Sequence, residues 1–341
     1  MNSLKVFFTV LLTVSLYSIV VFSESREEIS LNGIWKVSYD GSNFDHEMRV
    51  PGMIPIKPET YPEPVSHEVW YKKTIYLNKK FKKVFLKFYA VDNECTVYIN
   101  GDRIFKHLGG FDSFEFEVTP HLKLGENEII VYVKDLPLNQ FNGVVGKQDW
   151  YGNCIGIWQD AELILLKENT FFEKCIFEIS DSRIKVQTSV HGEWDEIHYF
   201  LFDENKVIIE GSSKNLNFVV KPHNIEKWTF ENPKLYSLRI NLLKDGKNID
   251  TIRKKIGFRK IDTKDGKILL NDVPIYIKGL LDQDFWPETG YVAPSKEAIR
   301  SQLLIAKQNG FNLIRYHVKI PPKQYIEAAD EIGMMLWIDL P

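Results

Sequence analysis

The sequence has almost no excess charge and few cysteines, and both shortages exclude classes of function. Lysine and arginine total 43 against 46 aspartate and glutamate residues, a formal net charge of -3, and no long basic cluster occurs. A nucleic-acid partner is therefore not expected. The three cysteines, Cys95, Cys154 and Cys175, are too widely spaced for a disulfide framework or a metal site. We expect buried free thiols, and one disulfide is the alternative in an exported protein.

Motifs for phosphate, dinucleotide and metal binding are also missing. The sequence has no P-loop, no GxGxxG after a strand and no Cys/His cluster with ligand spacing, so we expect no cofactor and no metal. Aromatic residues, in contrast, are abundant, with 8 Trp, 15 Tyr and 22 Phe. Most are expected in β-sheet cores, although aromatic rings are also the usual platform for the apolar faces of sugars.

The start of the chain has the three-part pattern of a secretory signal. Lys5 supplies a positive charge, residues 6–22 are apolar or carry hydroxyls, and small residues from Ser23 precede the polar Arg26. We predict a signal peptide at 1–25 and a secreted, periplasmic or cell-envelope location. An uncleaved membrane anchor is the alternative. No second apolar run is long enough to span a bilayer.

Short strands separated by turns fill residues 26–168. Residues 84–90 and 96–100 are rich in β-branched and aromatic side chains. Asn100-Gly101 lies between two such runs and predicts a hairpin, because both central residues of its turn need a positive φ. This succession predicts an all-β jelly-roll sandwich.

A second set of strands predicts an immunoglobulin-like β-sandwich over residues 169–262. Its length of about 90 residues suits that fold. Asp245-Gly246 marks another hairpin. The candidate strands are residues 184–190, 198–203, 216–220 and 236–243.

Residues 263–341 change to alternating strands and helices. Apolar strands are predicted at 274–279, 311–315 and 334–338. Ser295 is expected to cap a helix over 296–309, and a second helix is expected to open at Pro321-Pro322 and end at Gly333. The residues expected to face inward are Ile299, Leu303 and Ala306 in the first helix and Tyr325, Ile326, Ala329 and Ile332 in the second.

This alternation predicts a parallel sheet. A (β/α)₈ TIM barrel needs about 250 residues, so 263–341 is expected to hold only the first three strands of a truncated, incomplete barrel with an open edge. The fold class is therefore multidomain, with two β-sandwiches followed by the start of an α/β barrel.

Short segments along the chain resemble glycoside hydrolase family 2 in the family's own order. Short local matches are spread along the whole length after the predicted signal. They lie at residues 31–35, 97–101, 107–116, 156–163, 228–236, 257–259 and 271–279. The resemblance implies retaining hydrolysis of a β-glycosidic bond, with a β-glycoside or oligosaccharide as the substrate. Residues 281–290 depart from the polar cluster of the better-known members, so galactoside, glucuronide, mannoside and other sugars stay open.

The resemblance also implies two catalytic Glu residues, at the ends of the fourth and seventh barrel strands. The sequence reaches only the third strand, so no catalytic residue is assigned and the chain is expected to be inactive alone. Barrel active sites lie at the carboxyl ends of the strands, where carboxylates and Arg suit hydroxyl recognition and Trp suits stacking. The substrate-binding candidates on this basis are Asp282, Asp284, Trp286, Arg315, His317 and Asp339.

Each candidate has a structural alternative. Asp282 or Asp284 caps a loop or pairs with Arg315, His317 is a structural histidine, and Trp286 packs under a loop. The loops at 109–112 and 149–152, rich in aromatic and polar residues, either line a carbohydrate site or pack against a neighbouring domain.

The alternative function is a secreted, non-catalytic carbohydrate-binding protein built from the two sandwiches. A homo-oligomer or a complementing barrel fragment is a further expected partner.

Overall fold

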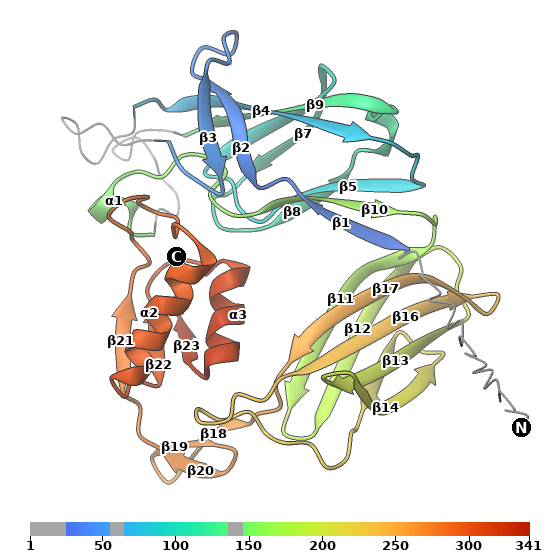
Figure 1. Ribbon diagram of the computed structural model, residues 1–341, viewed down its shortest axis with the longest axis vertical. Coiled ribbons are helices and arrows are strands. Elements are labelled where there is room, and N and C mark those ends of the chain that lie inside the picture. The colour runs from blue at the N-terminus through green and yellow to red at the C-terminus, as the bar shows by residue number, and fades with distance from the viewer. Residues whose placement is uncertain (1–24, 55–64, 136–145) are drawn as a thin grey trace, which may run out of the picture.

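Three bodies make up the described part of the computed structural model, residues 25–54, 65–135 and 146–341. One β-sandwich lies at the top of Figure 1, a second lies below it at the right, and an α/β unit lies below the first sandwich and to the left of the second. The predicted signal peptide falls outside the described residues except for its last position. No helix of the described residues is long and apolar enough to cross a membrane.

The first sandwich consists of two antiparallel sheets, with strand orders β1-β10-β5-β8 and β3-β2-β4-β9-β6-β7. Strands such as β9 alternate buried and half-buried residues, which gives one core between the sheets. The strands are β1 Arg26–Ser30, β2 Gly33–Ser38, β3 His46–Val50, β4 Glu68–Leu77, β5 Lys83–Phe88, β6 Glu94–Ile99, β7 Asp102–Leu108, β8 Phe114–Glu117, β9 Gly125–Lys134 and β10 Ala161–Leu166; the short helices are η2 Thr119–His121 and α1 Gln148–Tyr151.

The predicted hairpin at Asn100-Gly101 is confirmed. Asn100 has φ 51° and Gly101 has φ 92°, and the two residues join β6 to β7. Asn100 is also anchored, because its side-chain amide donates to the carbonyl of His121 and to Asn127 Oδ1. The turn therefore fixes the register of the two strands.

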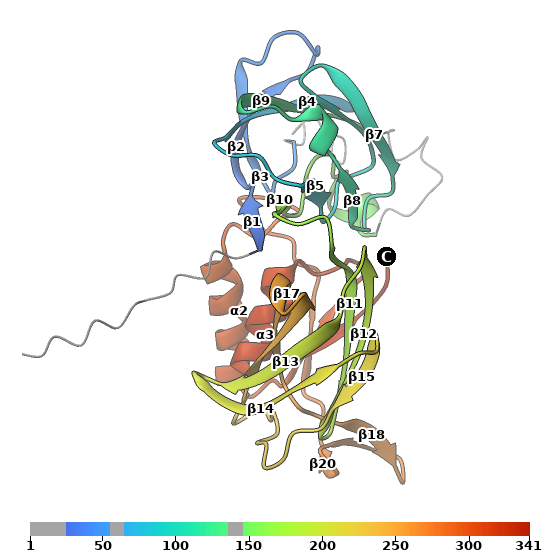
Figure 2. The same cartoon turned by 90° about the vertical axis from the view of Figure 1, so that its right-hand side faces the viewer.

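The second sandwich has a sheet β11-β12-β15 and a sheet β14-β13-β16-β17 (Figure 2). All four strands predicted here are present, and the turn at Asp245-Gly246 has the expected positive φ at both residues. The strands are β11 Phe171–Ser180, β12 Arg183–His191, β13 Glu196–Asp203, β14 Lys206–Ser213, β15 Asn217–Val220, β16 Tyr236–Lys244 and β17 Lys247–Ile256. A buried ion pair of 2.8 Å between Arg26 and Asp250 ties β17 to β1 of the first sandwich.

The prediction of a parallel strand at 274–279 was wrong. An antiparallel meander of β18 Ile261–Lys264, β19 Lys267–Leu270 and β20 Val273–Ile275 comes first. Asn271 and Asp272 both have positive φ and form a tight turn, which folds β20 back onto β19. The first parallel strand starts later, at Gly279.

The α/β unit has three parallel strands in the order β21-β22-β23, joined by two helices. Its elements are β21 Gly279–Asp282, α2 Lys296–Gln308, β22 Leu313–Tyr316, α3 Lys323–Ile332 and β23 Met335–Ile338. Ser295 caps α2 through a hydrogen bond from the Ala298 amide, and Gly333 ends α3 in a left-handed conformation, as predicted. That these strands open an eight-stranded barrel stays a prediction.

Of the residues predicted to face inward on the helices, only Ile326 is misplaced. The packed face of α3 consists of Tyr325, Ala328, Ala329 and Ile332. Ile326 is 40% exposed, because it lies about 100° around the helix from Tyr325 and turns away from the sheet. The expectation of buried free thiols is confirmed for Cys95 and Cys154, whereas Cys175 is free but only partly buried.

Candidate functional site

The carboxyl ends of the three parallel strands bring together residues far apart in the sequence. Asp282 ends β21, His317 follows β22 and Asp339 follows β23. The amide of His317 donates to the carbonyl of Asp282 at 2.8 Å, and the amide of Asp339 donates to that of Tyr316 at 3.0 Å. Adjacent parallel strands end at one edge of the sheet, which is where α/β proteins bind ligands.

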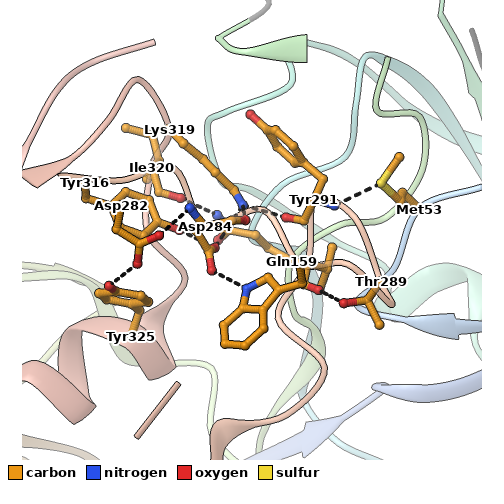
Figure 3. Close-up of polar contacts among 12 residues, drawn as sticks. Met53, Gln159, Asp282, Asp284, Thr289, Tyr291, Tyr316, Lys319, Ile320 and Tyr325 are labelled. Carbon is orange, nitrogen blue, oxygen red and sulfur yellow. Dashed lines mark hydrogen bonds and ion pairs between the residues drawn. The ribbon is translucent and has the colours of Figure 1, made fainter. Parts of the chain in front are cut away.

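A buried ion pair between Asp284 and Lys319 lies at this edge (Figure 3). The two side chains are 1% and 2% exposed, and Lys319 Nζ lies 2.9 Å from Asp284 Oδ2. Lys319 also donates to the carbonyl oxygens of Asp284 and Tyr291. Asp284 accepts further hydrogen bonds from the hydroxyl of Tyr316 and from Trp286 Nε1. Both carboxylate oxygens of Asp284 are therefore occupied by protein donors.

The environment of Asp284 keeps Tyr316 protonated. Burial, followed by the negative charge of Asp284, raises the pKa of Tyr316 well above its ordinary value. The phenol hydroxyl consequently remains a donor to the carboxylate, which suits a fixed structural cluster rather than an acid or a base.

Asp282 is also bound within the protein. Its Oδ1 accepts the amide of Asp284, and its Oδ2 accepts Gln302 Nε2 and the hydroxyl of Tyr325, each at 2.6 Å. Burial raises the pKa of Asp282, and the hydrogen bond from Tyr325 partly offsets this rise. Asp282 therefore ties the strand end to α2 and α3, which corresponds to the loop-capping alternative.

Arg315 pairs with Asp339, not with Asp282 or Asp284. Its Nε and Nη2 lie 2.9 Å and 2.8 Å from Oδ2 of Asp339, and His317 Nε2 lies 3.7 Å from the same oxygen. The Arg315 side chain is 49% exposed. Among the described residues, all contacts of the Asp339 carboxylate are made by its Oδ2. Nδ1 of His317 is buried and has no hydrogen-bond partner among these residues. The exposed Arg315 guanidinium and the second oxygen of Asp339 are therefore the polar groups of this trio that a ligand would meet.

The first sandwich supplies one wall of the site. Trp158 donates to the carbonyl of Gly110, and its ring lies 5.5 Å from the Lys319 ammonium. Gln159 Nε2 donates to the carbonyl of Ile320 at 3.0 Å. These contacts join the loop after β22 to the strand region that closes the first sandwich, so the wall and the sheet edge are held together.

The loops at residues 109–112 and 149–152 pack mainly against neighbouring residues. Phe111 meets Trp158 edge-on, and Tyr151 stacks on Phe285 with ring centroids 4.5 Å apart. Trp150, in contrast, is 67% exposed. The structure describes the backbone of Asp149 but not its side chain.

Trp286 faces a groove between the first sandwich and the loop after β21. The groove has a volume of about 630 Å³ and is also lined by Tyr151, Phe285 and Arg49. Ligand pockets usually have volumes of roughly 300–1,000 Å³ and carry apolar walls with a few polar groups. Trp286 is held in place by its hydrogen bond to Asp284 and also lines this groove, and its role in sugar binding stays a prediction.

Two non-glycine residues with positive φ lie at the same edge. Asp284 has φ 47° and Val318 has φ 46°. A left-handed conformation is costly for a β-branched residue such as valine and persists only where the surroundings enforce it. The Lys319 contacts supply that enforcement directly after Val318. Such strain is common at ligand sites.

Sequence reasoning missed Lys319 and Trp158. The position of Lys319, shortly after the second parallel strand, was the only available signal, and its partner Asp284 lies 35 residues away. Within the described residues, no cluster of His, Cys, Asp and Glu could hold a metal ion.

Two family models match the chain in order. The model of the sugar binding domain of the glycosyl hydrolases family 2 covers residues 22–167, and a second model, Glycosyl hydrolases family 2, covers residues 177–259. Together they span more than half of the chain.

Curated relatives include β-galactosidases and putative β-glucuronidases. The enzyme of Thermoanaerobacter pseudethanolicus is 25% identical, with 91% of this chain and 44% of the relative covered. That of Actinobacillus pleuropneumoniae is 28% identical, with 88% and 29% covered. The chain thus spans less than half the length of these relatives.

The solved structures that match share the fold. A β-glucuronidase from Ruminococcus gnavus in complex with D-glucuronic acid has a TM-score of 0.79 at 22% identity, covering 94% of this chain and 61% of that one. The order of the two matched models along one chain, with this shared fold, shows that the protein belongs to glycosyl hydrolase family 2.

Proposed function

We propose that this protein takes part in the retaining hydrolysis of a β-glycosidic bond, with a β-galactoside or a β-glucuronide as substrate. Family membership and the names of its relatives support this proposal. The observation that carries it is the convergence of Asp282, His317 and Asp339 at one edge of the parallel sheet.

The three aspartates at the sheet edge do not suit bond cleavage, and of them only Asp339 suits sugar binding. A retaining glycosidase needs two carboxyl groups about 5–5.5 Å apart, one as general acid/base and one as nucleophile. Asp284 is neutralised by Lys319, and Asp282 is bound on both oxygens. We therefore propose that the catalytic Glu pair comes from further barrel strands and that these 341 residues alone are inactive.

The parallel sheet of the α/β unit supports the proposal of a larger barrel. Leu281, Arg315 and Trp337 are Cα partners across the three strands and are all exposed on one face. Parallel sheets are normally covered on both faces, because their strands are apolar. We propose that further barrel strands, in the same polypeptide, a complementing chain or a second copy, cover this face.

The test is hydrolysis of nitrophenyl β-galactoside, β-glucuronide and β-mannoside. The purified 341-residue protein is compared with a version extended by the downstream reading frame. We expect turnover only in the extended form, on one sugar. Turnover by the shorter protein would overturn the proposal of a missing Glu pair. Sugar binding without turnover in both forms would support the alternative, a non-catalytic carbohydrate-binding protein.

We also propose export of the protein through the signal at residues 1–25. The charge and apolar pattern of the sequence supports this proposal. N-terminal sequencing of the protein from the native cell is expected to start near Arg26. A protein that keeps Met1 and fractionates with membranes would favour the anchor instead.

A further inference from the structure

The outer face of the second sandwich holds an arginine against two phenylalanine rings. The guanidinium carbon of Arg239, on β16, lies 4.5 Å from the ring centroid of Phe200 and 5.0 Å from that of Phe202, both on β13. Phe200 is the Cα partner of Arg239 in the sheet. Aromatic stacking fixes the plane of a guanidinium, so the orientation of Arg239 is set before any ligand arrives.

A second arginine stands beside Arg239. Arg253, on β17, is the Cα partner of Arg239, so the two cationic side chains are on the same face of neighbouring strands. Like charges in this arrangement destabilise a sheet. Burial, followed by the charge of Arg253, lowers the pKa of Arg239, and no carboxylate of the described residues contributes to that shift. Nε of Arg239 is buried without a hydrogen bond in this part of the chain.

Both arginines line a groove of about 1140 Å³ between the second sandwich, α3 and the first sandwich. Its size is sufficient for an oligosaccharide. Figure 1 shows α3 and the strands of the second sandwich on opposite sides of this region.

The acidic side chains that α3 contributes to the groove already have partners. Glu331 pairs with Lys255 and Arg300, and Asp330 pairs with Arg259. Glu327 lies 3.8 Å from Lys323 in a looser pair of the same kind. These acids are therefore not the counter-charge of Arg239, and no carboxylate of the described residues contributes to its pKa shift.

We propose that Arg239, with Arg253 beside it, binds the carboxylate or sulfate group of an acidic carbohydrate in this groove. A guanidinium of fixed plane matches an oxyanion through two parallel hydrogen bonds. An anion would also relieve the repulsion between the two arginines. The choice of a carbohydrate rests on the proposed function, whereas the anion site rests on the sheet geometry alone.

The experiment is calorimetric titration of the full 341-residue protein with four probes. They are trigalacturonate, a sulfated trisaccharide, neutral maltotriose and inorganic sulfate. We expect saturable binding of at least one acidic trisaccharide that weakens as salt rises, and no binding of maltotriose. Preference between the first two probes distinguishes a carboxylate site from a sulfate site. Binding of inorganic sulfate alone would overturn the assignment to carbohydrate.

Three variants make the test specific. Arg239→Gln is expected to weaken binding of the acidic trisaccharide about 10-fold or more, because a charge-assisted bidentate contact is lost. Arg239→Lys keeps the charge without the fork and is expected to give an intermediate loss. The control Arg183→Gln changes an exposed arginine on the other sheet and is expected to bind normally.

Circular dichroism checks that each variant folds. A further variant, Phe202→Leu, removes one stacking ring and keeps both charges. We expect it to weaken binding about 3-fold. Equal binding by Arg239→Gln and the unchanged protein would overturn the proposal, and so would no binding of either acidic trisaccharide at about 1 mM. Neither result depends on glycoside turnover, so a failure here is distinct from a failure of the proposed function.

Discussion

Replacing Lys319 by methionine is expected to be among the most destabilising single changes in the α/β unit. Methionine preserves much of the side-chain length but removes the ammonium group, and Asp284 then remains 1% exposed without its cation. Breaking a buried ion pair from one side costs about 3–5 kcal/mol, because the remaining charge stays buried and uncompensated.

The local contacts place the expected cost near the lower end of that range. Lys319 donates three hydrogen bonds, one to the Asp284 carboxylate and two to the carbonyls of Asp284 and Tyr291, and all three are lost. Tyr316 and Trp286 still donate to Asp284 and stabilise part of its charge. We therefore expect a loss of about 3 kcal/mol in the free energy of unfolding.

Urea unfolding followed by tryptophan fluorescence measures this loss, because Trp286 and Trp158 lie beside the pair. The matched control is Lys36→Met, since the pair of Lys36 with Glu47 is more than half exposed and is worth less than about 1 kcal/mol. The double variant Lys319→Met, Asp284→Asn should cost less than the sum of its parts. A loss for Lys319→Met no larger than the control's would refute the reasoning.

Three further predictions concern the described domains. Burial, followed by the charge of Asp135, raises the pKa of Asp92 well above its ordinary value. At pH values between the unfolded and the folded pKa, the Asp92 carboxyl is therefore protonated in the folded protein and ionised in the unfolded chain. Stability should therefore fall as pH rises above about 4, and Asp92→Asn should flatten that slope in urea unfolding at several pH values. Ser295→Ala removes the cap of α2 and should cost about 1 kcal/mol in the same assay. Gly101→Ala should strain the hairpin turn, because Gly101 has φ 92°. We expect a lower thermal midpoint, which corresponds to a loss of about 1 kcal/mol or more in the free energy of unfolding.

The parts of the fold that were predictable depend on neighbouring residues. The hairpin at Asn100-Gly101 and the caps at Ser295 and Gly333 need only local chemistry, since positive φ and a side-chain oxygen act within a few residues. The prediction for residues 274–279 was wrong because it used only local information. Their apolar pattern does not distinguish an antiparallel strand from a parallel one, and only the pairing of β20 with β19 decides it.

The site was predictable to the extent that topology decides it. The rule that parallel strands end at one edge correctly brings Asp282, His317 and Asp339 together. The partners that give each residue its role come from distant segments. Lys319 meets Asp284 through the folding of the α/β unit, and Trp158 meets Lys319 through packing of the first sandwich on that unit, neither of which a local pattern records.

The three aspartates at the sheet edge differ in whether a carboxylate oxygen is free to accept a hydrogen bond from a ligand. Asp284 has both oxygens bound and a cation against it, and Asp282 also has both oxygens bound. Of these three aspartates, only Asp339 has all its carboxylate contacts with described residues on one oxygen, from Arg315 and the nearby His317. A carboxylate recognises a sugar hydroxyl by accepting a hydrogen bond from it, so it needs an uncommitted oxygen. Asp339→Ala should therefore reduce sugar binding more than stability, whereas Asp284→Ala should chiefly reduce stability, and the opposite order would remove Asp339 from the site.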